Sequence, residues 1–215
     1  MMPLTEELPK PMIEINGCSI ISASIAQLRD KIPQIAITVG YRGSKLAKHV
    51  IENGVDMIFN TSNRGNAWWI FNTLMKFVNE PVLVLTCDNV VNLDLDFIFD
   101  NYCDLGHPVN MLIPVAPVAG IDGDYIEGED WVVRSLSRAV MTNLFCSGMQ
   151  VINPFLLNQI VPPVDDFAEL WDCLIKQNKL LYSKKYPGKW YTMNTLRDLE
   201  ALKVMDFDFG KIPKS

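Results

Sequence analysis

Pro81-Val-Leu-Val-Leu-Thr-Cys-Asp-Asn89 is an unbroken apolar run that ends in a carboxylate. Branched and Leu residues over this length, bounded by Pro and by polar residues, predict a strand over 82–85 that is buried on both faces. In open α/β sheets, ligands bind at the carboxyl ends of such strands. Asp88 is therefore placed where a catalytic or metal-binding carboxylate is expected, although a solvated turn Asp has the same local sequence.

The 215-residue chain has the composition of a globular protein, with 49% hydrophobic and 20% charged residues. We find no linker or repeat, and we expect a single domain over 1–215. The net charge of -6, with no Lys/Arg-rich run, argues against a nucleic-acid partner. No apolar run approaches the roughly 20 residues of a membrane span, so we expect no membrane partner. We expect no signal peptide either.

The five cysteines are scattered, and none forms a Cys-x-x-Cys pair. This spacing argues against a disulfide framework and against a zinc site. Free thiols predict a cytoplasmic setting. The contexts of His49 and His107 favour surface or helix-face positions over a role as ligand or base.

Strand and helix patterns alternate along the chain. Strands are predicted at 35–39, 55–59, 82–85, 110–115, 131–138, 144–152, 180–183 and 189–193. Helices are predicted at 20–31, 45–52, 68–77, 94–105 and 165–177, from Pro154, and after Thr195. This alternation is typical of βαβ units. It predicts an α/β fold, a Rossmann-like three-layer sandwich with a mixed, mainly parallel sheet.

Two segments are expected to be irregular. Three prolines within residues 1–17 argue against a regular helix there and hold Lys10, between Pro9 and Pro11, in a rigid extended loop. Residues 116–130 carry three glycines and five acidic residues, which is typical of a flexible segment or a lid. Ser44 is expected to cap the helix that follows it. The pair Trp68-Trp69 could stack on a ligand, but aromatic residues on a helix facing a sheet are more often core.

Five segments, in order along the chain, resemble the motifs of one enzyme family. They are Pro3-Leu-Thr…Pro9-Lys10-Pro11-Met12…Ile15-Asn-Gly17, Gly65-Asn66-Ala67, Leu83-Val-Leu-Thr-Cys-Asp88, Ser147-Gly148-Met-Gln-Val-Ile-Asn-Pro154 and Trp190-Tyr-Thr-Met-Asn194-Thr195-Leu-Arg-Asp198-Leu199. The family patterns are P-L-T…P-K-P, G-T-A, a strand ending in Asp, S-G-I-x-V-x-x-P and W-x-x-x-D-T-x-x-D-L. The chain thus resembles, over nearly its whole length, the nucleotidyltransferases that join a nucleoside triphosphate to a sugar phosphate or to phosphocholine. The resemblance implies a nucleotide-diphospho-sugar transferase-like fold.

The resemblance also implies a reaction, in which a substrate phosphate attacks the α-phosphorus of the triphosphate and pyrophosphate leaves. Both reactants are anions, so the protein must position them and neutralise charge, for which a Mg²⁺ cofactor is expected. The implied residues are Lys10 and Asp88 for catalysis, Asp88 and Asn194 for the metal, Gly65, Asn66 and Ala67 for the nucleobase, and Arg138, Ser147 and Gly148 for the acceptor. Asn194 stands where many members carry Asp, so metal binding should be weaker.

The implied partners are a nucleoside triphosphate, with CTP or UTP expected, and a phosphorylated small-molecule acceptor. Residues 60–74 are similar to the Asn- and aromatic-rich helix start of phosphocholine cytidylyltransferases, where aromatic faces hold a quaternary ammonium. The acceptor and the oligomeric state stay open.

One family signature is not matched. The family carries L-A-A-G-x-G-x-R before P-L-T, a loop whose backbone N–H groups cradle the triphosphate. Here Met1-Met2 precede Pro3. Two interpretations follow: a truncated start of an intact enzyme, or a relative that binds nucleotide or sugar phosphate without catalysis. We expect truncation, because the other motifs are maintained.

Overall fold

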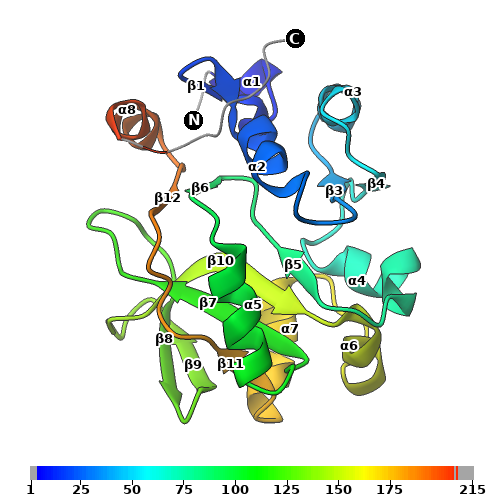
Figure 1. Ribbon diagram of the computed structural model, residues 1–215, viewed down its shortest axis with the longest axis vertical. Helices are drawn as coiled ribbons and strands as arrows, with labels where there is room; N and C mark the ends of the chain where they lie inside the picture. The colour runs from blue at the N-terminus through cyan, green and yellow to red at the C-terminus, as the bar shows by residue number, and fades with distance from the viewer. Residues whose placement is uncertain (1–3, 206, 208–215) are drawn as a thin grey trace. The chain divides into compact units, whose positions relative to one another are not determined.

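The computed structural model describes residues 4–205 and 207, and the chain divides into two compact units made of interleaved segments (Figure 1). Unit 1 comprises residues 1–64, 87–93 and 189–215, and unit 2 comprises residues 65–86 and 94–188. The expectation of a single domain over 1–215 is not tested by this division and stays a prediction.

Unit 2 is built on a six-stranded sheet with the order β5-β10-β7-β11-β9-β8. Its strands are β5 (Val82–Val84), β7 (Asn110–Val115), β8 (Tyr125–Glu129), β9 (Val132–Ser137), β10 (Phe145–Ile152) and β11 (Leu180–Tyr182). The mixed sheet is confirmed. Its neighbouring strands, however, pair mainly antiparallel, and the parallel ladder within it is that between β7 and β11. Periodicity identifies a strand but not the direction of its partner, so the expected predominance of parallel pairs does not hold in this sheet.

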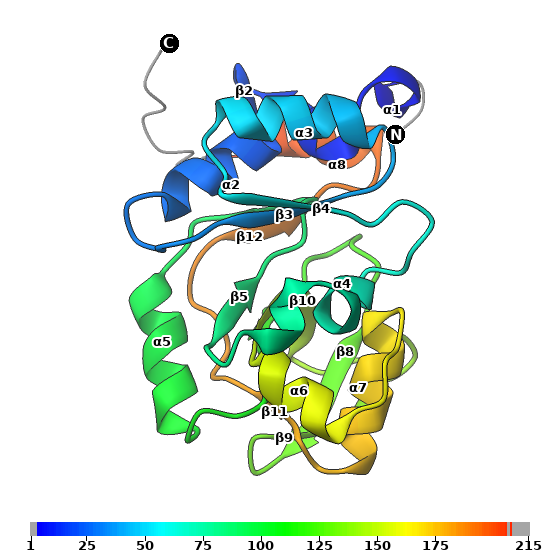
Figure 2. The same cartoon turned by 90° about the vertical axis from the view of Figure 1, so that its right-hand side faces the viewer.

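Helices cover both faces of this sheet, so that the three-layer α/β arrangement is confirmed within unit 2 (Figures 1 and 2). They are α4 (Trp68–Asn72), the 3-10 helix η2 (Leu74–Phe77), α5 (Leu95–Asp104), α6 (Pro154–Ile160) and α7 (Phe167–Lys176). In both views α5 lies on one side of the strands, and α6 and α7 lie on the other. The core between these layers includes Ile113 of β7 and Leu170 and Leu174 of α7, which are almost completely buried.

The expected helix over 68–77 is interrupted at Thr73. Its backbone is extended, with φ -122° and ψ -176°, and its hydroxyl donates to the carbonyl of Trp69 and accepts from the N–H of Met75. A Thr hydroxyl that bonds nearby backbone competes with helical hydrogen bonding, which explains the break. Trp69 is buried, as expected for a core residue.

Two further expectations for unit 2 were wrong. β5 is half-buried at each position, not buried on both faces, because it is an edge strand whose described ladder is to β10. Residues 125–129 belong to strand β8 and not to a flexible loop. The hairpin to β9 turns at Asp130 and Trp131, which both have positive φ. Two such residues match the twist of paired strands and so fix an antiparallel hairpin.

In the residues of unit 1 that the structure describes, there are three small two-stranded sheets and five helical segments. The antiparallel pairs are β1 (Glu14–Ile15) with β2 (Cys18–Ser19) and β6 (Asn89–Val91) with β12 (Trp190–Thr192), and the parallel pair is β3 (Ala36–Val39) with β4 (Met57–Asn60). The helices are α1 (Leu4–Glu7), the 3-10 helix η1 (Lys10–Met12), α2 (Ile20–Leu28), α3 (Gly43–Glu52) and α8 (Leu196–Val204). One core cluster of unit 1 joins α2, β3 and α3 through Ile21, Ile25, Ile35, Val39, Leu46 and Val50.

The N-terminal segment of unit 1 is more regular than expected. It contains α1 and η1. Pro11 is compatible with η1 because it stands within the first two positions, where its missing N–H costs no hydrogen bond. Ser19 caps α2 by accepting from the N–H of Ser22. Ser44 does not cap α3, whose N-cap is Arg42 with a positive φ of 48°. In the described part of the chain, no helix combines the length and the hydropathy needed to cross a membrane.

Candidate functional site

Three of the residues singled out in the sequence meet in unit 1. The Lys10 ammonium donates to Asp88 Oδ2 at 2.9 Å and to Asn194 Oδ1 at 2.9 Å. The side chains of Lys10 and Asp88 are 26% and 30% exposed, so the pair is accessible without being fully solvated. One carboxylate oxygen and one amide oxygen, from segments far apart in the sequence, thus point at the same cationic atom.

The backbone around Lys10 is fixed by its neighbours. Pro9 is the N-cap of η1 and Pro11 is buried. The N–H of Met12 donates to the Pro9 carbonyl at 2.9 Å, and the N–H of Ile13 donates to the Lys10 carbonyl at 3.1 Å. Two prolines with fixed φ lower the entropic cost of holding this turn. Any movement of the Lys10 ammonium is therefore a matter of its side-chain rotamers.

Asp88 and Asn194 are held next to each other by one strand pair. Asp88 directly precedes β6, Asn194 follows soon after β12, and these strands pair antiparallel with Asn89 opposite Thr192. Beyond the ladder, the N–H of Met193 donates to the backbone carbonyl of Asp88 at 3.0 Å. The two oxygen-bearing residues are thus fixed at the same end of a short ladder.

Asp198 fixes the backbone on the Asn194 side. Its Oδ2 accepts from the N–H of Asn194 at 2.8 Å and from the N–H of Thr195 at 2.7 Å, and the Thr195 hydroxyl accepts from the N–H of Asp198. This is a capping box at the start of α8, and the Asp198 carboxylate is buried. Asp198 was matched as part of the last motif and assigned no role, although the spacing Thr-x-x-Asp at a helix start is the local pattern of a capping box.

The oxygen pair suits a hard divalent cation. Carboxylate and amide oxygens are ligands of Mg²⁺, which usually keeps several waters and takes few protein ligands. Among the residues that the structure describes, no group of three or more His, Cys, Asp or Glu is placed to hold a metal. Asp88 and Asn194 are the side chains whose oxygens would hold a metal here, and this donor set fits Mg²⁺ bound together with phosphate.

The segment Gly65-Asn66-Ala67 lies in unit 2, against the residues before α7. The N–H of Ala67 donates to the Asp165 carbonyl at 2.8 Å, and Asn66 Oδ1 accepts from the N–H of Phe167 at 2.8 Å. A Cβ on Gly65 would stand 2.3 Å from the Asp165 carbonyl oxygen, so only glycine allows this approach. The segment is anchored by its own unit, and its contact with a nucleobase stays a prediction.

The three predicted acceptor residues also belong to unit 2. Arg138 is exposed and pairs with Asp122 at 3.0 Å and with Asp124 at 3.3 Å. Ser147 is buried, and its hydroxyl donates to the Ile113 carbonyl and accepts from the N–H of Met149. Gly148 has φ of 79° where the register of β10 against β7 shifts. Their contact with an acceptor stays a prediction.

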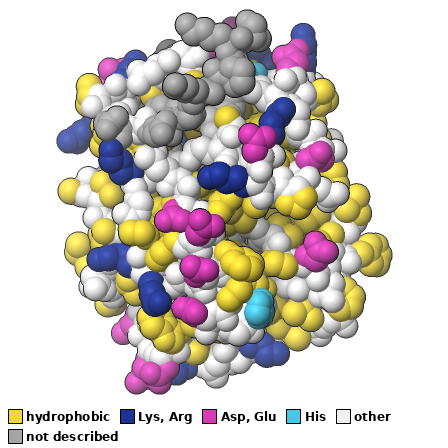
Figure 3. Space-filling view, viewed as in Figure 1, with side chains coloured by type: hydrophobic (Ala, Val, Ile, Leu, Met, Phe, Trp, Pro, Cys, Tyr) yellow, Lys and Arg dark blue, Asp and Glu magenta, His cyan; other side chains and the backbone are white. Residues whose placement is uncertain are grey.

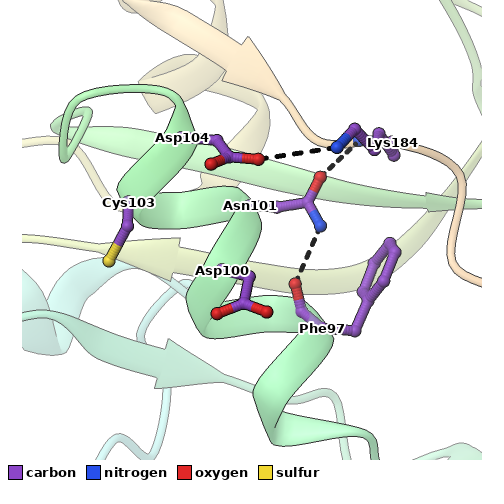
Figure 4. A pocket seen from close by; sticks show the side chains of 6 residues that line it. All are labelled: Phe97, Asp100, Asn101, Cys103, Asp104 and Lys184. Atoms are coloured by element: carbon purple, nitrogen blue, oxygen red, sulfur yellow. Dashed lines mark hydrogen bonds and ion pairs between the residues drawn. The ribbon is translucent and has the colours of Figure 1, made fainter.

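A shallow hollow of about 420 Å³ lies on unit 2 beside α5 (Figure 4). It is lined by Phe97, Asp100, Asn101, Cys103, Asp104 and Lys184. The Asn101 side-chain amide donates to the carbonyl of Phe97 and accepts from the backbone N–H of Lys184. The Lys184 ammonium lies 3.5 Å from Asp104 Oδ2. Figure 3 shows acidic and hydrophobic side chains interspersed over this part of the surface. The hollow contains none of the predicted site residues, and its polar groups largely satisfy one another.

Comparison with known proteins confirms the resemblance. No family model matches the chain. It is 26% identical over 201 residues to the bifunctional protein GlmU of Methanococcus maripaludis (strain C7), covering 88% of this chain and 47% of the relative. It is 24% identical over 220 residues to the mannose-1-phosphate guanyltransferase of Debaryomyces hansenii, covering 95% of this chain and 60% of that relative. The chain therefore spans about half the length of the GlmU relative that it matches.

Solved structures show the same fold. The inositol-1-phosphate CTP transferase from T. maritima superposes with a TM-score of 0.73 at 12% identity, covering 94% of this chain and 90% of the other. The CTP:phosphocholine cytidylyltransferase of Streptococcus pneumoniae superposes with a TM-score of 0.68 at 19% identity, covering 94% of this chain and 92% of the other. The α/β fold of nucleotide-diphospho-sugar transferase type, expected from the motifs, is thereby confirmed.

Proposed function

We propose that the chain is a nucleotidyltransferase that joins a nucleoside triphosphate to a sugar 1-phosphate or a phosphocholine-like acceptor and releases pyrophosphate. The observation that carries this proposal is the meeting of the Lys10 ammonium with the side-chain oxygens of Asp88 and Asn194, which together mark one cation position. The relatives named above, with sugar-phosphate and phosphocholine transferases among them, support the same reaction class.

The proposed roles follow from the chemistry of the three side chains. Asp88 and Asn194 would hold Mg²⁺, which supplies charge neutralisation for the phosphates when bound. Lys10 would bind phosphate oxygens as a point charge on a long stem, and its rigid turn would orient it. Because the reactants are both anions, holding them in line and neutralising their repulsion supplies most of the catalysis.

The proposed partners are CTP or UTP and a phosphorylated small molecule. A cytidine nucleotide is supported by two structural neighbours that are CTP-dependent by name. Gly65, Asn66 and Ala67 are proposed for the nucleobase, and Arg138, Ser147 and Gly148 for the acceptor. Nucleic acid and membranes are not proposed as partners. A cytoplasmic location is proposed on the ground that all five cysteines are free.

The test is a matrix of pyrophosphate-release assays. The chain is incubated with Mg²⁺, with each of CTP, UTP, GTP and dTTP, and with glucose 1-phosphate, mannose 1-phosphate, inositol 1-phosphate or phosphocholine. The proposal predicts release that requires both Mg²⁺ and one acceptor, and that is lost in Asp88→Asn. If no combination releases pyrophosphate, the enzyme assignment fails. A nucleotide-dependent rise in melting temperature would then favour a non-catalytic binding protein.

A further inference from the structure

The cation position between Asp88 and Asn194 is filled by part of the protein itself. The two bonds to Lys10, both 2.9 Å, are as short as charge-assisted hydrogen bonds are expected to be. Asn194 is neutral, so the Lys10 charge offsets the single negative charge of this oxygen pair. A divalent ion approaching the free chain would meet ligands with no net negative charge to attract it.

We infer that Lys10 is a built-in competitor for the metal, whose ammonium keeps divalent ions off Asp88 and Asn194 until a triphosphate draws it away. This inference rests on the proposed function for the identity of the anion. It gives one side chain two positions: bound to the metal ligands in the free chain, and bound to phosphate in the loaded chain. Metal and triphosphate would then bind together rather than independently.

The local structure allows such an exchange. An ammonium has three N–H donors, and two of them serve Asp88 and Asn194 in the described contacts, so that one remains for a phosphate oxygen. Lys has a flexible four-carbon stem, whereas the turn that carries it is set by Pro9 and Pro11. The backbones that carry the two oxygens stay in place when the ammonium leaves, because Asp198 and the β6–β12 ladder hold them.

The expected change in metal affinity runs opposite to that usually caused by removing a site residue. Removing a residue proposed for catalysis should strengthen metal binding in the absence of nucleotide. Because a metal no longer has to displace a partly exposed ion pair, we expect Lys10→Met to bind Mn²⁺ about three- to tenfold more tightly than the wild type. Lys10→Arg keeps the positive charge and should bind Mn²⁺ within about twofold of the wild type.

The experiment titrates the full chain with Mn²⁺ alone and measures free Mn²⁺ by electron paramagnetic resonance. The proteins are the wild type, Lys10→Met, Lys10→Arg and Lys48→Met, and circular dichroism checks that each is folded. Lys48 is an exposed lysine on α3 of the same unit, so its variant controls for the general loss of one positive charge. Tighter binding in Lys10→Met alone supports the inference. Equal or weaker binding in Lys10→Met, or equal tightening in Lys10→Arg or Lys48→Met, overturns it.

The outcome separates this inference from the proposed function. Tighter Mn²⁺ binding by Lys10→Met, with no pyrophosphate release by the wild type on any substrate, retains the competition and removes the enzyme assignment. Pyrophosphate release by the wild type, with unchanged Mn²⁺ affinity in Lys10→Met, removes the competition and retains the enzyme assignment. The absence of measurable Mn²⁺ binding by every variant also overturns the inference.

Discussion

In unit 2, strand β7 is buried at each of its six positions, whereas in unit 1 strand β3 has one buried position out of four. Unit 2 is stabilised by a six-stranded sheet between helices, whereas unit 1 is stabilised by two-stranded ladders, helix caps and a small apolar cluster. The meeting of Lys10, Asp88 and Asn194 occurs in unit 1. We therefore expect substitutions to separate metal binding, which is proposed for unit 1, from the sheet packing that stabilises unit 2.

The largest effect is expected at Asp88. Asp88→Ala removes the one carboxylate of the cation position, and we expect metal-dependent turnover to fall by about a thousandfold or more. The unfolding free energy should change by less than about 1 kcal/mol, because the ion pair is partly exposed. Pyrophosphate release and urea denaturation measure the two quantities. Asp30→Ala, at an exposed position of the same unit, should leave both unchanged. Unchanged turnover in Asp88→Ala would break the assignment of chemistry to unit 1.

The reverse pattern is expected at Leu170, which is fully buried on α7 of unit 2. Leu170→Ala leaves a cavity against the sheet and should lower the unfolding free energy by about 2–5 kcal/mol. The affinity of the folded chain for Mn²⁺ should stay the same. Leu156→Ala, at a position 39% exposed, is the matched control and should cost much less. A loss of Mn²⁺ affinity in Leu170→Ala at a temperature where it is folded would contradict the separation.

Substitution of Asp198 should lower both the unfolding free energy and the Mn²⁺ affinity. Asp198→Ala leaves the N–H groups of Asn194 and Thr195 without their acceptor, and we expect about 1–3 kcal/mol of destabilisation. Mn²⁺ affinity should also fall, because the backbone that positions the Asn194 side chain is no longer held in place. Asp198→Asn keeps an acceptor oxygen and should restore part of both losses, and Glu200→Ala on the exposed side of α8 should change neither. Destabilisation with unchanged Mn²⁺ affinity would limit Asp198 to a structural role.

The smallest effect concerns Tyr186 of unit 2. Burial raises the pKa of its phenol, and the N–H of Asp94 donates to the phenol oxygen. A raised pKa in the folded state means that the unfolded chain ionises first. The stability contribution of this group is therefore complete below the ordinary tyrosine pKa of about 10 and is lost as the pH rises through the folded value. Urea denaturation between pH 9 and 11 should show a shallower decline in Tyr186→Phe than in the wild type. Equal slopes would contradict this assignment.

Local sequence patterns predicted most helices and strands, because periodicity and caps are properties of neighbouring residues. Helices were expected from residue 20, from Pro154 and after Thr195, and the residues just before these helices, Ser19, Asn153 and Thr195, each accept a capping hydrogen bond. The direction of ladder partners and the edge position of β5 were not predicted, because an apolar run reports burial without saying which strand lies beside it. Strand β8 was not predicted either, because its segment is rich in Gly and acidic residues and its pairing partner cannot be identified from local sequence.

The candidate site was predicted from motifs and not from spacing. Lys10, Asp88 and Asn194 are up to 184 residues apart, and only the fold brings them together. The role of Asp198 was missed, even though a capping box is a local pattern, because its effect is exerted through the backbone of Asn194. The bonds that anchor Ser147 to its own sheet could not be read from the sequence, since they join it to the carbonyl of Ile113 on a neighbouring strand.

The most direct test is a crystal of the chain grown with CTP and Mn²⁺, with anomalous diffraction recorded to locate the metal. We expect an anomalous peak in contact with Asp88 Oδ2 and Asn194 Oδ1, with the Lys10 ammonium moved from these oxygens to a phosphate. Bound nucleotide with no metal at this position, and with Lys10 still bonded to Asp88 and Asn194, would contradict it.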